Sequence, residues 1–223
     1  MKTVRSTASR RETPRRPGLL TRLLHSNRGS ATSKFVILVP LMILILTGFA
    51  EIYCYLCAVS IVEYTAFMLA DSLGQLPQIV NDNSTSNANN LGALWSAATL
   101  LAMPNDLTSG GAVIITSICD GSPTSCVTPP QTPSLNPGIA VIHWQKGAPW
   151  NAGDLDTRIT SSNVVPSGWP FRVGDSAVVV EVIYKFNPFA MTAAFWPDAL
   201  GTQTIYERVY VRPRTGYPLD LVG

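Results

Sequence analysis

The sequence predicts an α+β fold: a long N-terminal transmembrane helix followed by an exported domain built on an antiparallel sheet. Two observations carry this prediction. The first is an apolar run from Phe35 to Val62, interrupted by a single charged residue, Glu51. The second lies beyond residue 110, where segments rich in Val, Ile, Tyr and Thr are bounded by Gly, Pro, Asn or Asp, the pattern of β-strands. We expect three regions: a basic leader (1–29), the membrane and extended helix (30–77) and an extracytoplasmic α+β domain (78–223).

The leader differs from the rest of the chain in its charge. Residues 1–29 contain eight Lys or Arg and one acid, Glu12, for a net charge of +7, whereas residues 30–223 carry −5. A basic segment ahead of an apolar run stays in the cytoplasm, so we expect a cytoplasmic N-terminus and an exported C-terminal domain. The alternative is a basic arm for nucleic acid or lipid headgroups. Because the adjacent apolar segment already explains the charge, we expect no nucleic-acid partner.

The apolar run is longer than a membrane span requires. A span needs roughly 20 apolar residues, and Phe35–Val62 exceeds that. Pro40 removes one helical hydrogen bond and should bend the helix near its start. Glu51 lies about 24 Å beyond Phe35, towards the far side of a bilayer. Its carboxylate either pairs with an amine or basic group of a neighbouring subunit, or is hydrated or protonated at the outer interface. The helix should end at Pro77.

Further elements follow after the polar stretch 81–90. Residues 91–103 predict a shorter helix that Pro104 stops. Four strands are predicted after it, over 111–119, 138–144, 175–186 and 202–212. Within the third strand, alternation places Val178, Val180, Val182 and Tyr184 on one face.

The four cysteines form two pairs with different interpretations. Cys119 and Cys126 flank the turn sequence DGSPTS, and export to an oxidising compartment favours a disulfide between them. The alternative is two free thiols beside a loop. Cys54 and Cys57 form a C-x-x-C inside the apolar helix, where small apolar residues on a packed face explain them better than a redox or metal site.

Motifs of known chemistry do not occur in the sequence. His143 is the one histidine beyond the leader, and neither a nucleophile nor a metal-ligand pattern surrounds it. We therefore expect no catalytic residues, no metal and no cofactor, and we expect that the protein is not an enzyme. A tethered periplasmic enzyme is the weaker alternative.

Three stretches together carry a resemblance to a known family. They are RGSATSKFVILVPLMILILTGFAEIY (28–53), the cysteine pair of the exported domain, and the tail DSAVVVEVIYKFNPF followed by YERVYVRPR. The chain resembles the TadE/TadG-like minor pilins (pseudopilins) of the tight adherence (Tad/Flp) type IV pilus. The resemblance implies a structural or assembly subunit in the bacterial inner membrane that can enter a surface pilus. Its implied partners are other minor pilins, pilus-assembly proteins and a prepilin peptidase.

The resemblance also places a cleavage site and exposes a departure from the family. A prepilin peptidase would cut after Gly29 and leave Ser30 as the new N-terminus. The fifth residue after the cut is glutamate in the family, where it neutralises the amine of an adjacent subunit; here it is Lys34. Either the subunit is processed and Glu51 supplies the missing charge in a shifted register, or Lys34 is the last positive residue of an uncleaved scaffold protein.

Overall fold

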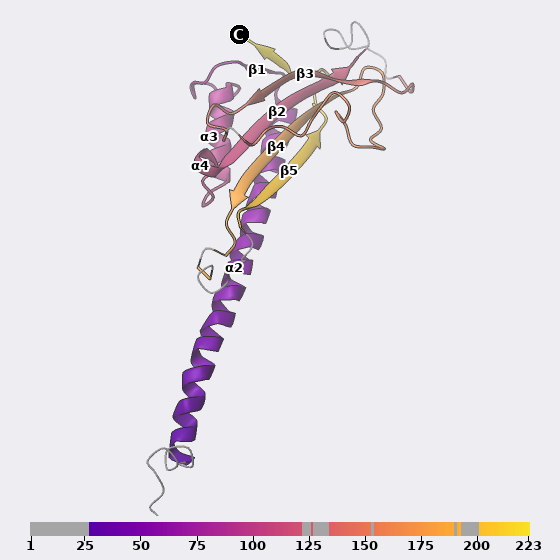
Figure 1. The fold of residues 1–223 in the computed structure, drawn as a ribbon. Coiled ribbons are helices and arrows are strands. Elements are labelled where there is room, and N and C mark those ends of the chain that lie inside the picture. The colour runs from indigo at the N-terminus through magenta and orange to yellow at the C-terminus, as the bar shows by residue number, and fades with distance from the viewer. Residues whose placement is uncertain (1–26, 122–125, 127–133, 153, 190, 193–200) are drawn as a thin grey trace, which may run out of the picture. The chain divides into compact units, whose positions relative to one another are not determined.

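The computed structural model describes residues 27–121, 126, 134–152, 154–189, 191–192 and 201–223, with only the backbone course for 27–33. Most of the leader, residues 1–26, therefore lies outside the described residues. The fold is α+β, with one long N-terminal helix and an antiparallel sheet (Figure 1). Two compact units divide the chain between Thr47 and Gly48, and every tertiary contact discussed below lies within Gly48–Gly223.

The long helix, α2, runs from Asn27 to Gln75 and contains Pro40. It ends two residues before Pro77, close to the predicted end. Within the described part of the chain, Lys34–Gln75 is the one helix long and apolar enough to cross a membrane. A buried core helix or an N-terminal signal sequence would satisfy the same criteria.

The main sheet has four antiparallel strands in the order β3-β2-β4-β5. They are β2 (Gly111–Asp120), β3 (Ala140–Gly147), β4 (Ser176–Phe186) and β5 (Gln203–Val211). The four predicted strands are confirmed, but β3 lies later than the predicted 138–144. The reason is that Gly138 donates its backbone N–H to Phe171 rather than to β2, while Lys146 still pairs with Ile115 in the ladder.

Shorter elements complete the second unit. The helix α3 (Leu91–Leu101) agrees with the prediction. Three further elements were not predicted, because three or four residues are too short to show a periodic pattern. They are α4 (Leu107–Gly110) and the parallel pair of β1 (Gln78–Val80) with β6 (Asp220–Val222).

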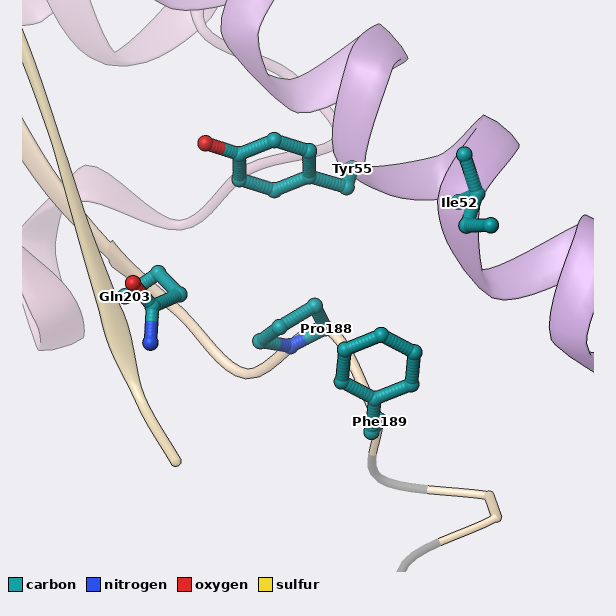
Figure 2. A pocket seen from close by; sticks show the side chains of 5 residues that line it. All are labelled: Ile52, Tyr55, Pro188, Phe189 and Gln203. Carbon is teal, nitrogen blue, oxygen red and sulfur yellow. The ribbon is translucent and has the colours of Figure 1, made fainter. Parts of the chain in front are cut away.

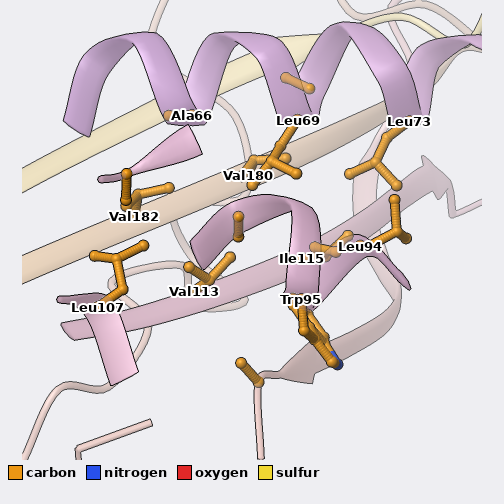
Figure 3. Close-up of a cluster of buried hydrophobic side chains, with 14 of the residues drawn as sticks. Ala66, Leu69, Leu73, Leu94, Trp95, Leu107, Val113, Ile115, Val180 and Val182 are labelled. Carbon is orange, nitrogen blue, oxygen red and sulfur yellow. The ribbon is translucent and has the colours of Figure 1, made fainter. Parts of the chain in front are cut away.

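Helices cover one face of the sheet (Figure 3). Val180 and Val182 of β4, with Val113 of β2, point toward Leu69 of α2 and Leu94 of α3 in one buried cluster. Val178 and Tyr184 belong to the same cluster, which confirms the predicted common face of β4. This packing attaches the C-terminal half of α2 to the sheet.

The other face of the sheet is covered by side chains of the irregular segment 155–171. Val179 of β4 packs with Ile159 and Phe171 from that segment, and Ile183 packs with Leu155. Because β4 is buried on both faces, its sequence is a nearly continuous valine run instead of a strict apolar–polar alternation.

Candidate functional site

Glu51 binds the connection between β4 and β5. Its carboxylate accepts hydrogen bonds from the backbone N–H groups of Met191 (2.7 Å) and Thr192 (3.0 Å) and from the Thr192 hydroxyl (2.5 Å). Only 2% of Glu51 is exposed. No ion pair in the described part of the chain involves it. The carboxylate therefore has donors within its own chain, a partner set that the sequence did not suggest.

A small pocket lies beside this connection (Figure 2). It has a volume of about 200 Å³ and is lined by Ile52 and Tyr55 of α2, by Pro188 and Phe189, and by Gln203 of β5. A cavity of roughly 150 Å³ with apolar walls can hold a benzene-sized group. These side chains can shelter an apolar group, and the only ionisable group among them is the Tyr55 phenol.

The buried face of α2 lies opposite an exposed apolar face. Ala58, Val62, Ala66, Leu69 and Leu73 recur every three or four residues and are at most 2% exposed. On the opposite side of the same helical stretch lies a row of large apolar side chains, which we call the outer stripe: Phe49 (68% exposed), Tyr53 (68%), Leu56 (57%), Tyr64 (53%) and Phe67 (59%).

The outer stripe has the geometry of a helix-packing seam. Its members, together with exposed Ser60, are also spaced three or four residues apart, so they line one side of the helix. Nothing in the described part of the second unit covers this side. Contiguous exposed apolar surface of this kind marks contact with membrane or protein.

The predicted cleavage and charge residues lie on the N-terminal part of α2. The backbone of Gly29 and Ser30 is helical, and Lys34 is exposed. Lys34 takes part in no ion pair with the residues that the structure describes. Lys34 and Glu51 lie 17 positions apart in the sequence and belong to different compact units.

Cys119 and Cys126 form a disulfide, with their Cα atoms 5.3 Å apart. The side chain of His143 approaches them: its ring nitrogen and the two sulfurs lie within 4.8 Å of one another. Bonded to each other, the sulfurs are not available as thiolate ligands, so this cluster is not a metal site in this state. His143 instead contacts the Asp220 carboxylate, at 3.2 Å. Cys54 and Cys57 are free thiols.

A second buried carboxylate, Glu181, was not recognised in the sequence. It lies in β4, is fully buried, and accepts hydrogen bonds from the Thr157 hydroxyl, the Arg158 backbone N–H and the Tyr206 hydroxyl. Burial, and then the bond to Glu181, raise the pKa of Tyr206 well above its usual range. The Arg158 guanidinium stacks over the Tyr206 ring at 4.1 Å. The group fastens segment 155–171 to the sheet, and the sequence signal for it was a lone glutamate inside a valine run.

Comparisons with protein-family models, curated proteins and solved structures find no match to this chain. Functional interpretation therefore rests on the two faces of α2, the Glu51 contact and the disulfide.

Proposed function

We propose that this protein is a minor pilin-like structural subunit of a tight adherence (Flp, type IVc) pilus, anchored in a bacterial inner membrane. In this proposal the N-terminal half of α2 crosses the membrane once, with the leader in the cytoplasm and the sheet domain in the periplasm. The outer stripe then packs against other pilin-like subunits or pilus-assembly proteins, in the membrane and in the assembled pilus.

The observation that carries the proposal is that α2 is longer than a bilayer is thick, so that part of the outer stripe extends beyond the membrane. Lys34–Gln75 comprises 42 residues, about 63 Å of helix, whereas a hydrocarbon core is about 30 Å thick. If the span begins near Phe35, roughly twenty residues bring it to about Cys54. Tyr64 and Phe67 then project from the helix outside the hydrocarbon, where large exposed apolar side chains favour a protein partner.

The sheet domain accounts for why one side of α2 is free. Its core already occupies the Ala58–Leu73 side, and Glu51 holds the β4–β5 connection on that side as well. Only the opposite side can pack against a neighbour. Between helices in a membrane, close van der Waals packing is the main attraction, and Phe49 and Tyr53 offer it within the proposed span. Tyr64 and Phe67 extend the same apolar surface outside the hydrocarbon.

Lys34 supports one alternative, an uncleaved scaffold protein of the pilus or secretion machinery. A lysine at this position can snorkel to the cytoplasmic headgroups and end a permanent anchor. Intact mass and N-terminal sequence from native membranes, with and without the prepilin peptidase, distinguish the two. A chain that begins at Ser30 only when the peptidase is present supports the pilin-like subunit, and a chain that always begins at Met1 supports the scaffold.

The outer stripe itself can be tested by photo-crosslinking in native membranes. A photoreactive residue replacing Phe67 should capture other pilin-like subunits or assembly proteins, identified by mass spectrometry. The same residue replacing Ser72, exposed on another side of α2, is the matched control. Phe67→Glu should abolish pilus incorporation while Ser72→Glu preserves it. Lipid-only adducts at position 67, or equal capture at both positions, would argue against assembly through this stripe.

A further inference from the structure

An open pocket with a volume of about 390 Å³ lies between Trp169, Pro170, Arg172 and Arg212. We call it the arginine pocket. It belongs to the sheet face opposite α2 and is separate from the outer stripe, so the proposed function leaves it without a role.

The loop that carries Arg172 is held rigidly by hydrogen bonds. The Arg172 backbone N–H donates to the Asp175 carboxylate, and the Asp175 N–H donates to the Arg172 carbonyl, both at 2.9 Å. The neighbouring Val173 N–H donates to Asn136, and the Gly174 N–H donates to Asp120. Gly174 adopts a φ of 85°, a conformation that favours glycine. A pocket on such a loop is preorganised, which lowers the entropic cost of binding.

The guanidinium groups of Arg172 and Arg212 differ in their hydrogen bonds and ion pairs. Arg212 donates to the Pro170 carbonyl at 2.5 Å and pairs with Asp175 at 3.0 Å, so its position is fixed. The Arg172 guanidinium is exposed and forms no hydrogen bond or ion pair with any residue in the described ranges. Two guanidinium groups therefore line the pocket, and one of them, that of Arg212, is paired with Asp175. Guanidinium groups bind carboxylates and phosphates through paired, charge-assisted hydrogen bonds.

The aromatic wall offers a flat surface and a spare donor. Trp169 packs on Tyr210 with ring centroids 5.0 Å apart, and Arg208 lies over the Tyr210 ring at 5.3 Å. The Trp169 indole N–H donates to none of the residues that the structure describes. A supported indole presents an apolar plane and a polar edge at the same time.

The arginine pocket also lies far from the membrane span that we propose. Arg214, two residues after Arg212, donates its backbone N–H to Gly74 at the C-terminal end of α2, at 2.7 Å. If the span ends near Cys54, as proposed above, Gly74 lies about 30 Å farther along the helix. A ligand of the same membrane's headgroup layer is therefore a poor candidate, and a ligand in the surrounding medium is favoured.

We propose that the arginine pocket binds an acidic saccharide, with the carboxylate of a uronic-acid ring on Arg172 and the ring's C–H face against Trp169. The oxyanion satisfies the unpaired guanidinium, and the ring matches the indole plane. An acidic peptide would supply the carboxylate without the ring, so it matches only half of the site.

The test uses the full chain in detergent micelles and calorimetric titration with three trimers. Trigalacturonate should bind saturably, and uncharged galactotriose and the equally charged triglutamate should each bind about tenfold more weakly. Arg172→Gln should weaken trigalacturonate binding by about tenfold or more, the loss of one hydrogen bond to a charged group. Lys146→Gln, which removes an exposed charge from β3, should leave it unchanged.

Three results would overturn the proposal. They are the absence of trigalacturonate binding at millimolar concentration, equal affinity for triglutamate, and unaltered binding by the Arg172 variant. Because Arg172 is exposed and its side chain is unpaired, the Arg172→Gln variant should fold normally, so each result reports on the site itself. Trp169→Leu serves as a second probe and should remove the preference for trigalacturonate over triglutamate.

Discussion

Glu51 shows how one ionisable residue in an apolar helix can be explained within its own chain. An acid in such a helix is expected to have a functional partner. The residues that donate to it, Met191 and Thr192, lie 140 and 141 positions later in the chain. A neighbouring subunit's amine therefore stays a prediction, and it would have to share this carboxylate with three existing donors.

Glu51→Gln should loosen the β4–β5 connection. Gln can keep its amide oxygen on the two N–H groups and turn its NH₂ to the Thr192 hydroxyl oxygen, but it lacks the negative charge that strengthens these bonds, so we expect a loss of about 1 kcal/mol in the free energy of unfolding. Denaturant unfolding in micelles measures the loss, and hydrogen exchange at the Met191 and Thr192 amides should accelerate. Glu63→Gln, at an exposed position of α2 that contacts neither amide, is the control for the exchange measurement. Unchanged exchange at both amides would show that Glu51 does not hold this connection.

Glu207 makes the stability of the fold depend on pH, in a direction that follows from its raised pKa. Burial, and then the charge of Glu63, raise the pKa of Glu207 above 4.5. The folded state thus favours the protonated acid, so this contribution to stability is complete below pH 4.5 and is lost as pH rises through the raised pKa. Glu207→Gln should be more stable than the native chain at pH 7, with the gain shrinking towards pH 4.5.

Thermal unfolding of both chains at the two pH values measures the Glu207 effect. Glu63→Gln serves as a partial control, because it removes the smaller of the two causes and should give a smaller gain. A gain that grows on acidification would contradict the assigned sign.

At the scale of elements, α2 has one side buried against the sheet and an opposite side that is exposed, although its sequence is apolar on both. Apolar residues surround the helix almost everywhere, so composition alone does not distinguish its buried side from its exposed side. The sheet selects the side of Ala58–Leu73 because small residues there allow close approach of the strands. The outer stripe is what remains, and its larger aromatic side chains face away from the domain.

The start of α3 is fitted closely to the preceding loop. A Cβ atom at Gly92 would lie 2.0 Å from the Asn83 carbonyl oxygen and 2.6 Å from that of Ser84. Gly92 also donates its N–H to the Asp82 carbonyl at 2.9 Å. Only glycine permits this approach, because the obstructing atoms belong to the backbone and cannot rotate away.

Gly92→Ala should destabilise the domain by about 1–3 kcal/mol, the usual range for overpacking. Gly48→Ala is the matched control, because Gly48 is also helical and a Cβ there meets nothing within 4 Å. It should be neutral or stabilising by up to about 1 kcal/mol. Denaturant unfolding of both variants is the measurement. Equal effects of the two substitutions would mean that the loop can retreat from α3.

At the scale of the whole molecule, the redox state of the Cys119–Cys126 pair indicates on which side of the membrane the domain lies. The Cys119–Cys126 bond closes a short loop, whose chain-entropy contribution is about 2–3 kcal/mol. Such a bond persists in an oxidising compartment and not in the cytoplasm. Its state in living cells therefore tests export of the domain without reference to any partner.

We expect protein trapped from cells with a thiol-alkylating reagent under denaturing conditions to carry two alkyl groups, on Cys54 and Cys57. After reduction it should carry four. Intact mass distinguishes the two, and the helix cysteines act as the internal control, because they are free in the structure. Four alkyl groups without reduction would place the domain in a reducing compartment and contradict the proposed topology.

The C-terminal segment joins parts of the domain that are distant in sequence. The Leu219 carbonyl accepts hydrogen bonds from the Trp144 indole (2.6 Å) and the Ser117 hydroxyl (2.9 Å), and β6 pairs with β1. None of these contacts has a local sequence signal, because each depends on where the sheet brings its strands.

The sequence by itself determined the long apolar helix, its end near Pro77, the second helix and the four strands of the sheet. These follow from local patterns: the length of an apolar run, a proline stop, and β-branched segments between turn residues. It also indicated the pairing of Cys119 with Cys126, because the residues between them, DGSPTS, are typical of a tight turn.

Only the tertiary structure decided which side of α2 is buried, what holds Glu51, how Glu181 is satisfied, and that the Arg172 guanidinium, beside Trp169, has no ion pair among the described residues. Each of these depends on residues that come from different strands and loops. Burial and hydrogen bonding depend on contacts between distant parts of the chain. Residues with the same local sequence pattern therefore differ in role according to which partners the folded sheet places beside them.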